Sequence, residues 1–119
     1  MSGESIVLKT EEPIEELTRQ IVDIPSPSGK EAGLADALEA ALVAAPHLET
    51  MRLGNTVAAR TSLGRKHRVV WAGHIDTVPV NHNLPSTVKE GFLHGRGTVD
   101  MKGGLAIGLK LALELVSPL

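Results

Sequence analysis

The sequence predicts an α/β chain in which a mixed sheet is flanked by helices. Two observations lead to this class. Apolar residues recur at helical spacing near both ends of the chain, and short apolar segments bounded by glycine and asparagine lie between them. Helices on either side of strands in this order are expected to cover the sheet. With 119 residues the chain is long enough for the core of one small domain.

The first part of the chain is expected to form two helices. One is predicted from Glu11 to Ile24 with Thr10 as N-cap, since acidic residues fill its first turn. The segment "PSPSG" then interrupts the helix, and a capping box of Ser28 with Glu31 predicts the start of the next, which Pro46 ends. The stripes expected to be buried are Ile14, Leu17 and Ile21 in the first helix, and Leu34, Leu38, Ala41, Leu42 and Ala45 in the second.

Three strand-like regions follow. "LETMRL" and "TVAART" on either side of a Gly-Asn pair predict a hairpin, and "TVKEGFLHG" predicts a smaller hairpin that turns at Glu90-Gly91. "RVVWAG", from Arg68 to Gly73, is almost continuously apolar, as expected of a central strand buried on both faces. We therefore expect Val69, Val70 and Trp71 to be largely buried.

The chain is expected to end in a helix. Its apolar face comprises Leu105, Leu109, Leu113 and Val116, with Ala112 beside them, and the Ser117-Pro118 pair is expected to stop it.

The composition excludes several functional classes. The absence of cysteine rules out disulfide scaffolds, thiol catalysis and cysteine-based zinc sites. A net charge of -2, with Trp71 and Phe92 as the aromatic residues, gives no reason to expect nucleic-acid or membrane binding. The first residues lack the pattern of a signal peptide, and no apolar run approaches the ~20 residues of a membrane span. We therefore expect a soluble, cytoplasmic protein.

Two short motifs could carry chemistry. In "GHIDTVP", His74 and Asp76 follow the expected central strand, and residues two apart in an extended segment point to the same side. His74 could bind a divalent metal through one ring nitrogen while Asp76 holds the other N–H. In "GRGTVDMKGG", Asp100 stands among glycines at the start of the last helix, where its carboxylate could bridge two metal ions.

Each motif also has a purely structural interpretation. An isolated H-x-D is more often a loop histidine with satisfied hydrogen bonds, and an aspartate before a helix is most often an N-cap. Lys102 is expected to be solvated, and both it and Arg96 are left without a role. The remaining histidines, assigned to surface structure, are His47, His67, His82 and His94.

The combination of the motifs resembles a known family. "VVWAGHIDTVPV" followed by "GRGTVDMKGGLAIGL" is similar to the dinuclear zinc metallohydrolases that include aminoacylases, acetylornithine deacetylase and succinyl-diaminopimelate desuccinylase. The resemblance runs from "IPSPSGKE" through "GNTVAAR" to the last helix. Within the family, "HIDTVPVN", "NLPS" and "PHLETMRLGNTVAARTSLGR" look most like the actinobacterial desuccinylases.

The resemblance implies roles for the matching residues. His74 would bind one zinc ion, Asp100 would bridge both zinc ions, and Asp76 would be the catalytic-motif aspartate that supports His74. Cobalt is a possible replacement for zinc. The implied reaction is hydrolysis of N-succinyl-LL-2,6-diaminopimelate to succinate and LL-2,6-diaminopimelate, in lysine and diaminopimelate biosynthesis. The alternatives are another N-acyl amino acid deacylase, a metallopeptidase of the same family, or a non-catalytic binding module.

The chain also departs from the family in its length. The resemblance implies a considerably longer protein, in which a Glu-Glu pair follows the last helix and an inserted domain forms a homodimer. Residues 1–119 are therefore expected to be the N-terminal part of the catalytic domain, without the remainder and the dimerisation domain. With two metal ligands and no general base, we expect at most weak metal binding and no catalysis by these residues alone.

Overall fold

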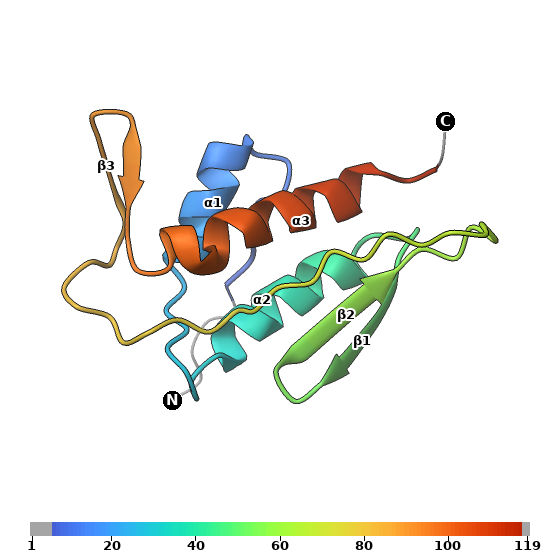
Figure 1. Ribbon diagram of the computed structural model, residues 1–119, viewed down its shortest axis with the longest axis horizontal. Helices are drawn as coiled ribbons and strands as arrows, with labels where there is room; N and C mark the ends of the chain where they lie inside the picture. Colours follow the sequence, from blue (N-terminus) through green and yellow to red (C-terminus); the bar gives the residue numbers. More distant parts are fainter. Residues whose placement is uncertain (1–5, 118–119) are drawn as a thin grey trace.

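The computed structural model describes residues 6–117 and contains helices and short strands, which confirms the α/β class. Figure 1 shows three α-helices beside two hairpins. The elements, in order, are α1 (Ile14–Val22), α2 (Ala32–Val43), β1 (Glu49–Leu53), β2 (Thr56–Arg60), β3 (Thr87–Lys89), β4 (Phe92–His94), the π-helical turn η1 (Thr98–Lys102) and α3 (Gly103–Glu114).

The core lies where the three helices meet. Leu17 and Ile21 of α1 are fully buried, as predicted, and they belong to one apolar cluster with residues of α2 and α3. Burying side chains of this size stabilises the fold by about 1.5–3 kcal/mol each. The other buried members of the cluster are Leu8, Ile24, Leu34, Ala37, Leu38, Ala106 and Leu109. Ile14, Ala41, Leu42, Leu105 and Leu113 are partly buried against it.

The helix ends differ from those expected. Thr10 is not the N-cap of α1, because the helix begins after Pro13, whose ring disfavours helical backbone at the residue before it. Ser28 does not form a capping box either. Its hydroxyl binds Asp76, and Glu31 occupies the N-cap position of α2. Val116 lies beyond the end of α3 and is 51% exposed, so it does not extend the apolar face of that helix. Pro118, half of the expected stop signal, lies outside the described residues.

Both predicted hairpins are confirmed. β1 and β2 pair antiparallel with Leu53 opposite Thr56, and β3 and β4 pair antiparallel across the turn at Glu90-Gly91. The β1–β2 hairpin packs against α2. The mixed sheet that was expected is not formed within residues 6–117, since the strands there make two separate two-stranded sheets.

The predicted central strand from Arg68 to Gly73 is wrong. This segment is not a strand, and Val69, Val70 and Trp71 are 95%, 75% and 55% exposed. An apolar run is buried on both faces only where other strands and helices cover it. Here the β1–β2 hairpin packs against α2. No strand of the described chain pairs with residues 68–73.

Candidate metal centre

The segment that carries His74 and Asp76 is held by the loop that follows α1. Ser26 accepts a hydrogen bond from the backbone N–H of Thr77 at 2.8 Å through its carbonyl, and its hydroxyl donates to the carbonyl of Ile75 at 2.7 Å. The backbone N–H of Ser28 donates to the carbonyl of Thr77 at 3.0 Å. These bonds surround a parallel bridge between Pro27 and Thr77. They fix the backbone on both sides of Asp76.

Asp100 lies in η1, which a buried lysine anchors to the end of α1. The side chain of Lys102 is 1% exposed, and its Nζ donates to the carbonyl of Ile24 at 2.7 Å. Its backbone N–H donates to the carbonyl of Gly97 at 2.8 Å. The expectation that Lys102 is solvated is therefore wrong. The spacing of residues along the last helix does not reveal that this lysine reaches through the core to the carbonyl of Ile24, just after α1.

The three predicted site residues come together, as expected. His74 Nε2 lies 2.8 Å from Asp100 Oδ1, while His74 Nδ1 lies 3.2 Å from Asp76 Oδ1 and 3.1 Å from the Asp76 carbonyl oxygen. The imidazole is thus held between two carboxylates that approach from opposite ring nitrogens. The site does not lie at the end of a sheet, because residues 68–73 form no strand.

A fourth residue, Ser28, extends this arrangement. Its hydroxyl donates to Asp76 Oδ2 at 2.5 Å, leaving Asp76 Oδ1 to face His74. Nothing in the sequence separates Ser28 from a helix-capping serine, since the same "SGKE" pattern satisfies a capping box. Only the chain fold, which places residues 28 and 76 together, reveals the contact.

The electrostatics of the site favour the charged form of the His74 imidazole and the ionised form of Asp76. The hydrogen bond that His74 donates to the Asp100 carboxylate raises the pKa of His74, with smaller contributions in the same direction from Asp76. The hydrogen bond from Ser28 lowers the pKa of Asp76. The side chain of His74 is 47% exposed and that of Asp100 is 84% exposed, so the site is open to solvent.

The donor atoms suit a divalent cation such as zinc. Imidazole nitrogen and carboxylate oxygen are ordinary zinc ligands, and tetrahedral bonds of about 2.0–2.1 Å separate neighbouring ligand atoms by roughly 3.3 Å. His74 Nε2 and Asp100 Oδ1 are therefore about 0.5 Å closer than a shared zinc ion requires, a small adjustment for exposed side chains. Within residues 6–117, no group of three or more His, Cys, Asp or Glu side chains is arranged to hold a metal ion. His74 and Asp100 therefore offer two ligand side chains.

The other histidines are separate from the site. His67, His82 and His94 are exposed, as expected. His47 is partly buried, and its Nε2 contacts the carbonyl of Ala112 at 2.8 Å, so it connects α3 to the loop before β1 instead of lying free at the surface.

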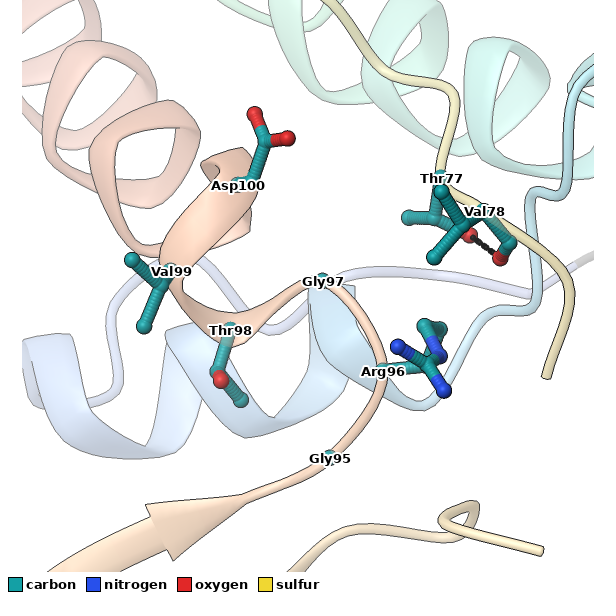
Figure 2. Close-up of a pocket in the computed structure, with 8 residues that line it drawn as sticks. All are labelled: Thr77, Val78, Gly95, Arg96, Gly97, Thr98, Val99 and Asp100. Atoms are coloured by element: carbon teal, nitrogen blue, oxygen red, sulfur yellow. Dashed lines mark hydrogen bonds between the residues drawn. The ribbon is translucent and has the colours of Figure 1, made fainter. Parts of the chain in front are cut away.

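A hollow of about 210 Å³ lies beside Asp100. Figure 2 shows its two walls, with Thr77 and Val78 on one side and the turn from Gly95 to Asp100 on the other. Gly97 has φ +85° and lies so close to Thr77 that an added Cβ would be 2.6 Å from Thr77 Cγ2. Glycine at this position therefore allows both the turn and the close approach of the walls.

Comparison with known proteins identifies a family that part of the chain resembles. Residues 70–118 match peptidase family M20/M25/M40. The matched region includes the whole of both motifs, and therefore His74, Asp76 and Asp100. The resemblance to metallohydrolases that the motifs indicated is confirmed at the level of sequence.

Three curated relatives extend the similarity to the rest of the chain. Succinyl-diaminopimelate desuccinylase of Corynebacterium glutamicum is 55% identical over 95 residues, which are 78% of this chain and 26% of the relative. The putative succinyl-diaminopimelate desuccinylase of Mycobacterium tuberculosis is 55% identical over 104 residues, 87% of this chain and 29% of the relative. A putative [LysW]-lysine/[LysW]-ornithine hydrolase of Thermococcus kodakarensis is 38% identical over 112 residues, 91% of this chain and 30% of the relative.

The chain therefore spans less than a third of the length of these three relatives. In the described part of the chain, no helix has the length and apolar character needed to cross a membrane.

Proposed function

We propose that residues 1–119 are the N-terminal part of the catalytic domain of a zinc-dependent amidohydrolase. Its reaction would be hydrolysis of N-succinyl-LL-2,6-diaminopimelate to succinate and LL-2,6-diaminopimelate. The observation that supports this most is the contact of His74 with Asp100 at 2.8 Å, within a chain 55% identical to two succinyl-diaminopimelate desuccinylases. We further propose that the complete protein is a cytoplasmic homodimer that binds two zinc ions, with cobalt as a possible replacement.

In this proposal, the residues of the chain bind and orient the metal. His74 Nε2 and the Asp100 carboxylate would be the ligands, with Asp100 shared by the two ions. Asp76 accepts the proton of His74 Nδ1 in a hydrogen bond, which leaves Nε2 free to bind metal and makes the ring more basic. Without metal, a proton lies between His74 Nε2 and Asp100 Oδ1, and metal binding must displace it.

When bound, a pair of metal ions would supply a water molecule of lowered pKa and would polarise the amide carbonyl, so that the C–N bond would be hydrolysed with a proton passing from the water to the leaving amine. A general base is needed for these proton transfers, and its loss costs roughly 10²–10⁴-fold in rate. Neither residue 76 nor residue 100 is free for this role in the proposed arrangement. We therefore expect no succinate release from residues 1–119 alone.

Zinc binding to the 119-residue chain tests the metal site. Calorimetry is expected to show weak binding to the wild-type chain, and none to His74→Ala or Asp100→Ala. His67→Ala, which alters an exposed histidine away from the site, is the matched control and should bind zinc like the wild type. Equal zinc affinity in the wild type and both site variants would contradict the proposed ligands.

A chimera tests the reaction. In it, this chain replaces the matching segment of the Corynebacterium glutamicum relative, to which it is 55% identical. We expect the chimera to release succinate from N-succinyl-LL-2,6-diaminopimelate, and the activity to be lost on Asp100→Ala and kept on His67→Ala. A folded chimera that binds zinc but does not hydrolyse this substrate would contradict the proposed reaction.

A second candidate is hydrolysis of another N-acyl amino acid or a peptide by the same site. The 38% identity to a putative [LysW]-lysine/[LysW]-ornithine hydrolase favours it, because that similarity covers 91% of this chain. Assaying the chimera with N-acetylornithine and with other N-acyl amino acids would separate the candidates. A non-catalytic binding module, the third alternative, predicts no turnover of any of these amides.

A further inference from the structure

An arginine lines the hollow beside Asp100. Arg96 lines the hollow together with Asp100, and Figure 2 shows the two side chains coming from different parts of the same turn, with Arg96 on the side nearer Thr77 and Val78. Arg96 is partly buried. Its Nε is inaccessible to solvent and has no hydrogen-bond acceptor among the residues that the structure describes.

Arg52, Arg60 and Arg68 differ in this respect, and Arg19, whose Nε also lacks an acceptor, has its Nη1 3.9 Å from Glu16 Oε2. Arg52 donates to Asp36 at 2.5 Å, Arg60 donates to Glu49 at 2.8 Å, and Arg68 donates to the carbonyl of Thr61 at 3.1 Å. A guanidinium with a structural role satisfies its donors in this way, since an unpaired buried donor is costly. The Nε–H of Arg96, by contrast, has no acceptor within residues 6–117, and the side chain lines a hollow.

The size and charge of the hollow limit what it can accept. Sites for whole small molecules usually enclose about 300–1,000 Å³, so a hollow of about 210 Å³ suits one end of a small molecule. Guanidinium groups match carboxylates in planar shape and charge, and they bind them through two parallel hydrogen bonds. At the same time, the Asp100 carboxylate in the wall repels an anion unless a cation neutralises it.

We propose that Arg96 forms a carboxylate-binding subsite next to the metal centre. It would bind the free carboxylate of a small dicarboxylic acyl group, such as succinyl, whose other end is the amide at His74 and Asp100. This assignment rests on the proposed function for the identity of the acyl group. The subsite would select dicarboxylic over uncharged acyl groups, because an uncharged group leaves the Arg96 donors unpaired.

Titration of the metal-free 119-residue chain with succinate tests the subsite. Amide NMR signals of residues 95–100, and of Thr77 and Val78, are expected to shift with succinate and not with the neutral analogue succinamide. Arg96→Gln should weaken succinate binding roughly tenfold or more, since a charge-assisted pair is lost. Arg96→Lys keeps the charge without the planar fork and should show an intermediate affinity. Arg65→Gln, at an exposed arginine far along the sequence, is the matched control and should leave succinate binding unchanged.

Asp100→Asn separates the subsite from the metal centre. Removing the neighbouring negative charge should strengthen succinate binding severalfold, whereas the same variant should bind zinc less well. Arg96→Gln should leave zinc affinity unaltered. If zinc fails to bind the wild-type chain while succinate binds through Arg96, the metal proposal fails and the subsite stands.

Two results would overturn the subsite. One is equal succinate affinity in the wild type, Arg96→Gln and Arg96→Lys. The other is a set of shifts centred on the basic segment 65–68 with none at residues 95–100. If Arg96→Gln does not fold, Arg96→Lys and Asp100→Asn still test the subsite, since both keep a cation at position 96. Succinate affinity is predicted to fall in Arg96→Lys and to rise in Asp100→Asn.

Discussion

Lys102 shows how a single buried side chain can connect two elements. Its amine crosses from η1 to the carbonyl of Ile24 at 2.7 Å, and it thereby fixes the turn that presents Asp100. Burial lowers the pKa of Lys102 from its ordinary 10.5 to about 8, against a smaller opposing effect of Asp23. The folded chain therefore releases this proton at a lower pH than the unfolded chain does.

The consequence is a stability that rises with pH. Between pH 8 and 10.5 the unfolded chain holds the Lys102 proton and the folded chain does not, so unfolding takes up a proton. The free energy of unfolding should increase by about 3 kcal/mol across this interval. Urea unfolding of the metal-free chain at several pH values measures it. Lys102→Met should remove the slope, whereas Lys89→Met, at an exposed lysine in β3, should keep it. Parallel slopes for the wild type and Lys102→Met would contradict this account.

Ser28 acts on the site through Asp76. Its hydroxyl holds Asp76 Oδ2 at 2.5 Å, which orients the carboxylate toward His74 Nδ1. Partners that orient a metal ligand typically change metal affinity by about 10–100-fold when removed. Because Ser28 lies one contact further from the metal, Ser28→Ala should weaken zinc binding by roughly tenfold or less, as calorimetry would measure. Ser28→Thr should restore it, and Ser62→Ala, whose hydroxyl binds Glu49, should have no effect. An unaltered zinc affinity in Ser28→Ala would show that Asp76 is oriented without the hydroxyl.

At the scale of the elements, glycines determine how closely segments approach. Gly97 has φ +85°, and a Cβ there would lie 2.6 Å from Thr77 Cγ2, while Gly91 has φ +80° with no atom within 4 Å of its added Cβ. Gly91→Ala should cost about 1–2 kcal/mol for the left-handed backbone alone. Gly97→Ala should cost about 1–3 kcal/mol more, since the wall of the hollow must also move. The difference between the two variants in urea unfolding is the measurement, and equal losses would mean that the contact with Thr77 relaxes freely.

The same scale separates what the sequence could predict from what it could not. The helices and hairpins were predictable because their signals are local, such as the spacing of Leu17 and Ile21 or the turn at Glu90-Gly91. The convergence of His74, Asp76 and Asp100 was also predictable, from two motifs. The failure at residues 68–73 arose because burial of a strand depends on neighbours that periodicity does not identify. Ser28 and Lys102 were missed for a related reason, since their partners lie 48 and 78 positions away.

For the molecule as a whole, exposed apolar side chains gather along residues 69–71 and α3. The radius of gyration is 14.7 Å, against about 13.5 Å expected for a compact domain of this length. Figure 1 shows residues 64–75 as an extended segment that is not itself a strand. Trp71 lies against α3, where an added Cβ at Gly108 would be 2.4 Å from its ring. We call Val69, Val70, Trp71, Ile107 and Leu111, which are 39–95% exposed, the apolar patch.

This apolar patch predicts self-association of the 119-residue chain. Residues 68–73 make no backbone hydrogen bond to another described residue, so they combine an unpaired edge with apolar side chains. Sedimentation at increasing concentration should show the average mass rising above that of the monomer. Val70→Glu should shift this rise to higher concentration, because two copies would then bring like charges together. Val88→Glu, at a valine that is 60% exposed on β3 outside the apolar patch, is the matched control and should associate like the wild type. If the chain stays monomeric at all concentrations, the apolar patch does not cause association. The same conclusion follows if Val88→Glu reduces association as much as Val70→Glu does.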